Sequence, residues 1–186
     1  MRVVPYDPRW PADFDEERAR IRAALAGIAV RIDHNGSTSV PGLAAKPIID
    51  IQISVDRLHP MHRYLPALER LGYVHLPHAD DDRCPFFHRP AEWPHTHHVH
   101  VVEAGGEEER QTLAFRDYLR EHPETAREYA ELKRDLAAAH DGLTAESREA
   151  YAAAKTSFVN RVVTMALRGT EDRPDSGGSG QAVESK

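Results

Sequence analysis

The stretch HNGSTSVPGLAAKPIIDIQI, residues 34–53, joins a turn to a strand and decides the fold. In its second half, apolar side chains at positions 49, 51 and 53 alternate with Asp50 and Gln52. This period of two predicts a β-strand with one buried face, because successive side chains of a strand point to opposite sides. We therefore expect Asp50 and Gln52 to project together from the other, polar face.

The turn NGSTSVPGLAAKP separates this strand from an earlier branched stretch, IAVRIDH, which is also typical of a strand. A strand, a Gly-Ser turn and a short helical segment can bring backbone N–H groups and hydroxyls together on an anion, since the first donors of a helix lack internal partners. Candidate ligand-binding residues are therefore Gly36, Ser37, Thr38 and Ser39. A plain helix cap that binds no ligand is the alternative.

Asp50 needs a metal, a positive charge or water beside it, because burying an unpaired carboxylate is unfavourable. Lys46, in the loop before the strand, is a ready positive charge. Both are candidate catalytic residues, and Asp50 is also a candidate metal ligand. Alternatively, Asp50 lies on a solvated face or pairs with Lys46, and neither residue is catalytic.

Histidine is abundant, with twelve in the chain and four in the segment HTHHVHVVE. On the strand HHVHVVE, His98 and His100 point to one face, whereas His95 and His97 are expected in the preceding loop. Two imidazoles and a carboxylate form a standard ligand set for a borderline metal, so His98, His100 and Asp50 are candidate catalytic residues and metal ligands if their strands are adjacent. Without a metal, the two histidines are acid–base groups, anion contacts or plain surface residues.

The remaining segments supply the framework. Three prolines near the N-terminus precede a helical pattern that ends at Gly27. Further along, the pattern predicts a helix at about 58–71, short strands in YVHL and CPFFHR around the loop PHADDD, and three helices from about residue 107, separated at Pro123 and Gly142.

Strands mixed with helices in the first half, followed by helices alone, predict the α+β class. We expect a mixed β-sheet with helices on one side and a helical C-terminal half. One domain is expected over residues 1–169, followed by a disordered, Gly/Ser-rich polar tail over 170–186.

Composition excludes several classes of protein. A net charge of -6 argues against nucleic acid as a partner, since backbone phosphates require a concentrated basic surface. No apolar run approaches the roughly 20 residues that cross a bilayer, and no secretory signal is recognisable. A single cysteine, Cys84, forms no internal disulfide. We therefore expect a cytoplasmic protein with a small-molecule partner and no membrane association; the oligomeric state is not indicated.

Several other residues carry less weight. Cys84 is expected to be a small buried hydrophobe rather than a nucleophile. From the helical half, Arg116, Arg120, Lys133 and Lys155 could reach a cleft, where they would suit phosphate or carboxylate. For each of them, an ordinary surface charge is the alternative.

Five segments, taken in order and spacing, resemble the GrpB family, which is assigned to the nucleotidyltransferase superfamily: VVPYDPRWPADF, HNGSTSVPGLAAKPIIDI, HHVHVVE, FRDYLREHPETAREYAELK and YAAAKTSFV. The resemblance runs from about residue 3 to about residue 167. It implies a nucleotidyltransferase-like fold, with a twisted mixed sheet and the Gly-Ser turn at the mouth of a cleft. The family is poorly characterised, and some bacterial members are fused to dephospho-coenzyme A kinase.

The resemblance also implies roles for individual residues. In the superfamily, Gly-Ser holds a triphosphate and the next strand presents two carboxylates to two magnesium ions. Gly36 and Ser37 match the first element and Asp50 matches the first carboxylate, but Gln52 stands at the second, and a neutral amide cannot replace that charge. His98 and His100 stand near a third position, and imidazole suits zinc, iron or manganese better than magnesium.

Three functions follow as hypotheses. The first is metal-dependent nucleotidyl or phosphoryl transfer to a small anionic substrate, with magnesium or manganese and a nucleoside triphosphate. The second is a nucleotide-independent lyase, cyclase, hydrolase or oxygen-using reaction at one zinc, iron or manganese ion on Asp50, His98 and His100. The third is a non-catalytic binding or chaperone-like module. The superfamily precedent favours an enzyme of the first kind.

Overall fold

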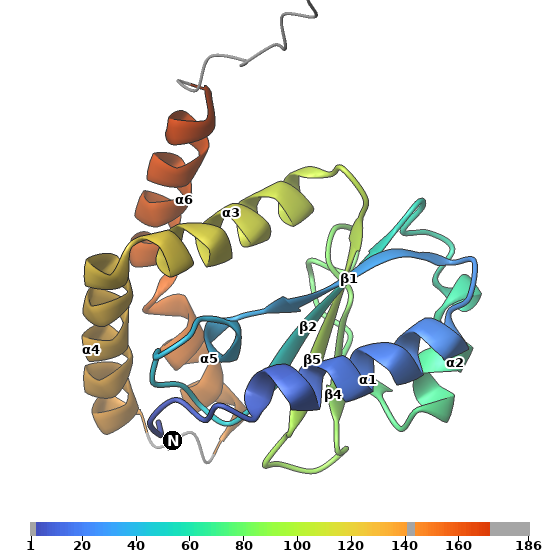
Figure 1. The fold of residues 1–186 in the computed structure, drawn as a ribbon. Coiled ribbons are helices and arrows are strands. Elements are labelled where there is room, and N and C mark those ends of the chain that lie inside the picture. Colours follow the sequence, from blue (N-terminus) through green and yellow to red (C-terminus); the bar gives the residue numbers. More distant parts are fainter. Residues whose placement is uncertain (1–2, 141–143, 172–186) are drawn as a thin grey trace, which may run out of the picture.

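The computed structural model describes residues 3–140 and 144–171, and a five-stranded sheet forms its centre (Figure 1). The strands are β1 (Ala29–Asn35), β2 (Ile49–Val55), β3 (Val74–His75), β4 (Phe86–Arg89) and β5 (His97–Glu103). Their order in the sheet is β1-β2-β5-β4-β3, with β2 and β5 parallel and the other neighbours antiparallel. The α+β class and the mixed sheet are confirmed, and β2 and β5 are adjacent, as the candidate site requires.

Helices cover both faces of this sheet. The described residues form α1 (Trp10–Ala24), α2 (Leu65–Arg70), α3 (Glu107–Glu121), α4 (Pro123–Ala139), α5 (Ala145–Ala153) and α6 (Thr156–Glu171), with short 3-10 segments η1 (Ser37–Ser39) and η2 (Met61–Arg63). In Figure 1, α1 and α2 lie on one side of the sheet, while α3 crosses the other side and leads into α4.

The helical C-terminal half contains one more break than predicted. The break at Pro123 is confirmed, and Gly142 lies outside the described residues. An additional break at Ala154 and Lys155 separates α5 from α6, so the described part of this half contains four helices rather than three. Neither residue is a proline or glycine, so the local sequence gives no signal for this break.

The main core lies between the sheet and the pair α1 and α2. Ile51 and Ile53 of β2 are fully buried beside Val99 and Val101 of β5. Fully burying such a side chain stabilises the fold by about 1.5–3 kcal/mol. The predicted apolar face of β2 is therefore confirmed.

The prediction that β2 has only one buried face was wrong. Gln52 and Ser54, on the second face, are fully buried because α3 covers them. Ser54 Oγ donates a hydrogen bond to the Glu109 carboxylate on α3, and Thr112 Oγ1 donates to Gln52 Oε1. Of the three polar side chains on this face, Asp50 is the one that stays partly exposed.

A second apolar cluster joins the loop after η1 to the helical half. Its buried residues come from that loop and from α3, α4 and α6: Val40, Leu43, Leu119, Ala126, Tyr129, Ala130 and Val162. This packing fixes α4 and α6 relative to the Gly-Ser turn.

Two further expectations concern the ends of the chain and the membrane. Within the described residues, no helix combines the length and apolar character needed to cross a bilayer. Of the predicted tail over 170–186, residues 172–186 lie outside the described residues, and the single domain over 1–169 stays a prediction.

Candidate functional site

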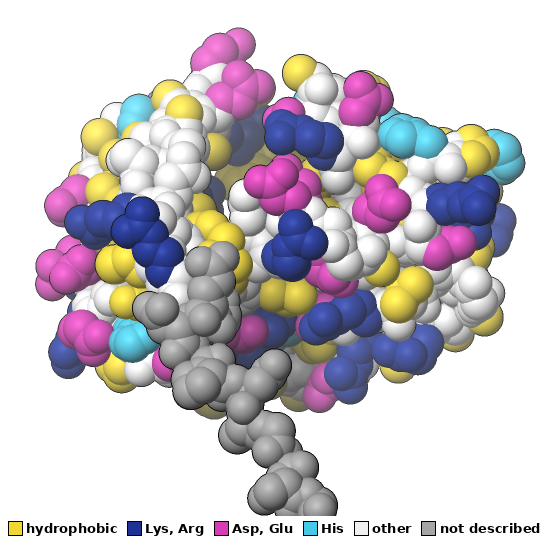
Figure 2. All heavy atoms as spheres, turned by 90° about the horizontal axis from the view of Figure 1, so that it is seen from above, with side chains coloured by type: hydrophobic (Ala, Val, Ile, Leu, Met, Phe, Trp, Pro, Cys, Tyr) yellow, Lys and Arg dark blue, Asp and Glu magenta, His cyan; other side chains and the backbone are white. Residues whose placement is uncertain are grey.

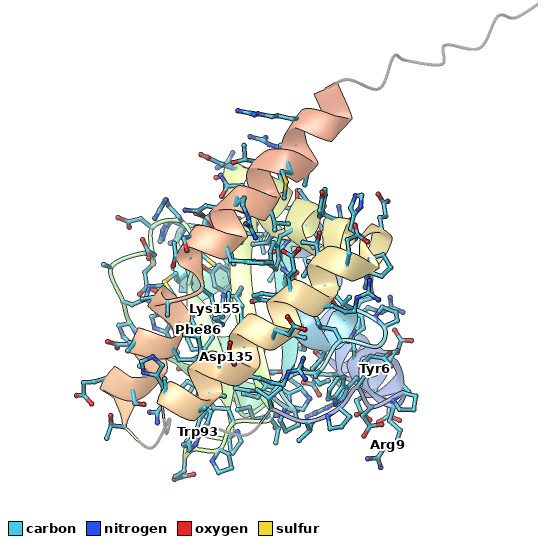
Figure 3. The ribbon with its side chains drawn as sticks, turned by 90° about the vertical axis from the view of Figure 1, so that its left-hand side faces the viewer. Tyr6, Arg9, Phe86, Trp93, Asp135 and Lys155 are labelled. Atoms are coloured by element: carbon cyan, nitrogen blue, oxygen red, sulfur yellow. The ribbon has the colours of Figure 1, made fainter. Side chains whose placement is uncertain are left out.

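A cleft of about 590 Å³ lies between the sheet and the helical half. Ser37, Lys46, Asp50, His98 and His100, all predicted from the sequence, line it. The helical half contributes Lys133 from α4, Arg148 and Tyr151 from α5, and Lys155 from the break between α5 and α6. Figure 3 views the molecule from the side of these helices and labels three lining residues, Phe86, Trp93 and Lys155.

Gly36 lets the turn approach the start of β2 closely. Its neighbour Asn35 pairs with Asp50 across the β1–β2 ladder, and Gly36 has a φ of 64°. A Cβ atom at Gly36 would overlap Asp50 Oδ2. Glycine is therefore required here twice, for its left-handed backbone and for the space that the carboxylate occupies.

The three hydroxyls of the turn do not act together. Thr38 and Ser39 are buried, and their side chains bond within the protein: Thr38 Oγ1 donates to Ile48 O, and Ser39 Oγ donates to Gly36 O. The structure therefore places Thr38 and Ser39 in the support of the turn and leaves Ser37 facing the cleft.

Asp50 and His98 face each other across the parallel β2–β5 pair. The register places Asp50 opposite His98, and Asp50 Oδ1 lies 3.3 Å from His98 Nδ1. Burial on its own would raise the pKa of Asp50, but the hydrogen bond from His98 and the fields of His98, His100 and Lys155 outweigh it and lower the pKa. Asp50 is therefore ionised at neutral pH.

A chain of imidazoles continues from this pair. His98 Nε2 lies 3.1 Å from His95 Nδ1, and the His95 ring stacks on His88 with centroids 4.0 Å apart. His95 precedes β5 in a loop, as predicted, and still lines the cleft. His97 begins β5, which agrees with the predicted strand HHVHVVE and not with the alternative placement of His97 in the loop. The spacing His95-x-x-His98 was the available signal for His95, and nothing singled out His88.

Three lysines share the cleft with Asp50: Lys46, Lys133 and Lys155. Burial and the like charge of Lys155 lower the pKa of Lys46 to about 8 and that of Lys133 to about 7. Burial also lowers the pKa of Lys155, although Asp50 opposes this shift. Lys133 Nζ donates a 2.6 Å hydrogen bond to Ala44 O, which ties α4 to the loop before β2. These lysines can attract an anion into the cleft.

Other predicted residues lie elsewhere. Arg116 contacts Asp33 and Asp117, and Arg120 donates to Ser39 O, so both brace the turn rather than line the cleft. Burial raises the pKa of Cys84 to about 12, which makes its thiol a poor nucleophile. Cys84 is half-buried rather than fully buried, and its raised pKa agrees with the expectation that it is not a nucleophile.

The residues fit a pair of magnesium ions poorly. Gln52, at the position of the second carboxylate, is buried beneath α3 with its Oε1 hydrogen-bonded, and it does not line the cleft. The fit to a single metal is closer but incomplete. Asp50 and His98 are adjacent, His100 Nδ1 faces Cys84 Sγ at 3.6 Å, and within the described ranges no three or more His, Cys, Asp or Glu side chains are grouped to hold a metal.

Comparison with known sequences identifies relatives over most of the chain. A family model described as "GrpB protein" matches residues 1–165. The UPF0157 protein PA4798 of Pseudomonas aeruginosa is 41% identical over 173 residues, which cover 91% of this chain and 69% of that protein. A dephospho-CoA kinase of Mycolicibacterium paratuberculosis is 32% identical over 166 residues, covering 76% of this chain and 41% of the kinase.

Comparison with solved structures agrees. The crystal structure of the conserved protein GrpB from Enterococcus faecalis has a TM-score of 0.79 and 32% identity, covering 92% of this chain and all of that one. The Cid1 poly(U) polymerase bound to MgGTP has a TM-score of 0.50 and 14% identity, covering 75% of this chain and 45% of the polymerase. The second likeness shows a shared nucleotidyltransferase-like fold and nothing further.

Proposed function

This chain belongs to the GrpB family, and from that premise we propose that it is an enzyme that transfers a phosphoryl or nucleotidyl group from a small phosphate-bearing anion bound in the cleft. One observation carries the proposal. The ionised carboxylate of Asp50 is held against the Gly36–Ser37 turn in a cleft that also contains Lys46, Lys133 and Lys155. The cleft therefore contains a proton acceptor, Asp50, close to lysines that can bind an anion.

The lysines support the binding part of the proposal. An ammonium group in a poorly hydrated cleft attracts a phosphate more strongly than it does in water. Burial first, and then the like charge of Lys155, lower the pKa of Lys46 and Lys133, and a bound phosphate would offset both effects. The Ser37 hydroxyl, which also interacts with Tyr129, lines the same cleft as an uncharged polar group.

Asp50 and His98 support the chemical part. The lowered pKa of Asp50 keeps the carboxylate in the form that accepts a proton. In the proposed reaction, the attacking hydroxyl gives its proton to Asp50, its oxygen forms a bond to phosphorus, and the bond from phosphorus to the departing phosphate oxygen breaks. His98 holds the carboxylate in position through Oδ1.

A small molecule suits the surface better than nucleic acid does. On the face shown in Figure 2, lysine and arginine side chains are interspersed with acidic ones instead of forming a basic stripe. The net charge of -6 points the same way.

The test is binding followed by turnover. We expect inorganic pyrophosphate and nucleoside triphosphates to raise the melting temperature in the presence of EDTA, because a ligand that binds the native state alone stabilises it. Product formation from a triphosphate and a panel of small hydroxyl compounds should then depend on Asp50. Failure of every phosphate compound to stabilise the protein would reject the proposal.

A second candidate function rests on the 3.3 Å approach of Asp50 Oδ1 to His98 Nδ1, with His100 in the same cleft. To hold one zinc, iron or manganese ion together with Asp50 and His98, His100 would have to turn from Cys84 toward that pair. When bound, the ion would supply a Lewis acid for a nucleotide-independent reaction. The test is metal content. This candidate requires about one such ion per chain, retained on dialysis and lost in both His98→Ala and His100→Ala.

A further inference from the structure

Tyr151 is a buried hydroxyl without a hydrogen-bond partner in the cleft wall. Its side chain is 1% exposed, and no atom of the described residues hydrogen-bonds to its OH group. Buried polar groups are nearly always satisfied, and an unsatisfied one destabilises the protein that carries it. Tyr64 shows the ordinary arrangement, since its buried hydroxyl donates to Leu58 O at 2.9 Å.

Two lysines lie over the ring of the same tyrosine. The ammonium of Lys46 is 4.0 Å from the Tyr151 ring centroid, and that of Lys155 is 4.6 Å from it. Lys46 comes from the loop before β2, whereas Tyr151 in α5 and Lys155 just after it are four residues apart. Side chains four residues apart are neighbours on a helical turn, so the pairing of Tyr151 with Lys155 is local and the approach of Lys46 depends on the fold.

The ring holds the two positive charges near each other without neutralising them. Attraction to an aromatic face offsets part of the desolvation of an ammonium group, but two cations at one ring still repel each other. The whole cleft has the same imbalance, with Lys46, Lys133, Arg148 and Lys155 against the carboxylates of Asp50 and Glu149. A ligand with two negative charges would restore the balance.

We propose that Lys46, Tyr151 and Lys155 form a subsite for a doubly charged phosphate group, with the Tyr151 hydroxyl donating to one of its oxygens. This inference rests on the proposed function and deepens it, because it assigns to the substrate a terminal phosphate or pyrophosphate rather than a carboxylate. A carboxylate has one charge and two oxygens, whereas a phosphate group has the charge for both lysines and a third oxygen for the hydroxyl.

The variant Tyr151→Phe separates this role from a structural one. It removes only the hydroxyl and keeps the ring under the two lysines. Because that hydroxyl has no partner among the described residues of the free protein, we expect the melting temperature of the free variant to be unchanged or higher. Calorimetric titration with inorganic pyrophosphate should show affinity reduced by about tenfold, the loss of one hydrogen bond to a charged group.

Tyr64→Phe is the matched control. Its hydroxyl is satisfied by Leu58 O and its side chain does not line the cleft, so this variant should melt at a lower temperature and bind pyrophosphate as the unchanged protein does. Lys155→Met should weaken pyrophosphate binding more than Tyr151→Phe does and should reduce its salt dependence.

The outcomes are distinguishable. If the unchanged protein and Tyr151→Phe bind pyrophosphate equally, the subsite is overturned while the proposed function survives. If Tyr151→Phe melts as early as Tyr64→Phe, the hydroxyl has a structural partner and the subsite is again overturned. If neither pyrophosphate nor inorganic phosphate binds the unchanged protein, the subsite is overturned. If nucleoside triphosphates also fail to bind, the proposed function is rejected with it.

Discussion

Thr112 on α3 donates a hydrogen bond to the side-chain oxygen of Gln52 on β2, and this contact buries the residue that stands in place of a second carboxylate. Gln52 therefore belongs to the packing of α3 on the sheet. Its side chain supports the nucleotidyltransferase-like fold and does not reach the cleft.

Gln52→Asp should not create a magnesium site. The new carboxylate would lie beneath α3 beside Glu109, so we expect a loss of stability on the order of 3 kcal/mol, as for an uncompensated buried charge. Urea unfolding measures this loss, and titration with magnesium and a nucleoside triphosphate measures binding. Magnesium-dependent binding gained in a stable variant would show that Gln52 is a lost ligand after all.

Gly36→Ala should displace Asp50. The added Cβ would overlap Asp50 Oδ2, and the backbone at φ 64° and ψ -170° lies in a region essentially restricted to glycine, which adds strain of about 1–3 kcal/mol. Gly42→Ala is the matched control, because Gly42 also has a positive φ, 77°, but nothing lies within 4 Å of the position that a Cβ atom would take there. Both variants should lose stability, and only Gly36→Ala should lose turnover; equal turnover in the two would contradict the close contact.

Asp50→Asn should separate binding from chemistry. Removing the negative charge leaves the lysines with less compensation, so pyrophosphate should bind several-fold more tightly. Turnover should fall by about 10²-fold or more, because the amide cannot accept a proton. Calorimetry and a product assay provide the two measurements, and turnover at the original rate would remove Asp50 from the mechanism.

The buried lysines predict opposite pH effects on binding and on stability. Burial lowers the pKa of Lys133 to about 7 and that of Lys46 to about 8, against about 10.4 in the unfolded chain. Between these values the unfolded chain binds more protons, so this contribution to the free energy of unfolding rises with pH. Binding of sulfate, whose charge is constant in this range, should weaken from pH 7 to pH 9.

Lys133→Met provides the control for this pH dependence. In this variant, the free energy of unfolding and the affinity for sulfate should change less with pH near pH 7. Their change near pH 8, which Lys46 causes, should remain. Sulfate binding that does not change from pH 7 to pH 9 would show that the lysines do not hold the anion.

Much of the sheet could be predicted, because its strands alternate clearly. The predicted strand HHVHVVE coincides with β5, and the predicted IIDIQISV differs from β2 by one residue. The pairing of these two strands could not be predicted in the same way, because an alternating pattern does not show which strands are neighbours. The contact between Asp50 and His98 therefore became evident only from the fold.

The parts of the site that escaped prediction depend on long-range packing. Tyr151 lies in an alanine-rich helix whose sequence resembles any surface helix, and the cleft position of this residue follows from how α5 packs. Thr38 and Ser39 were predicted to bind a ligand, but their hydroxyls bond to the backbone instead. A hydroxyl in a turn can do either, and here the carbonyl groups of Ile48 and Gly36 lie within reach of the two side chains.

The parallel pairing of β2 with β5 makes reactivity depend on strand alignment. Val99 and His100 alternate between core and cleft, so a shift of β5 by one position would exchange the imidazoles for valines. Changes in the length of the loop before β5 can be absorbed as long as this alignment is kept. A deletion of one residue inside β5 would instead turn histidines into the hydrophobic core. We expect such a variant to lose activity even though it keeps the other site residues.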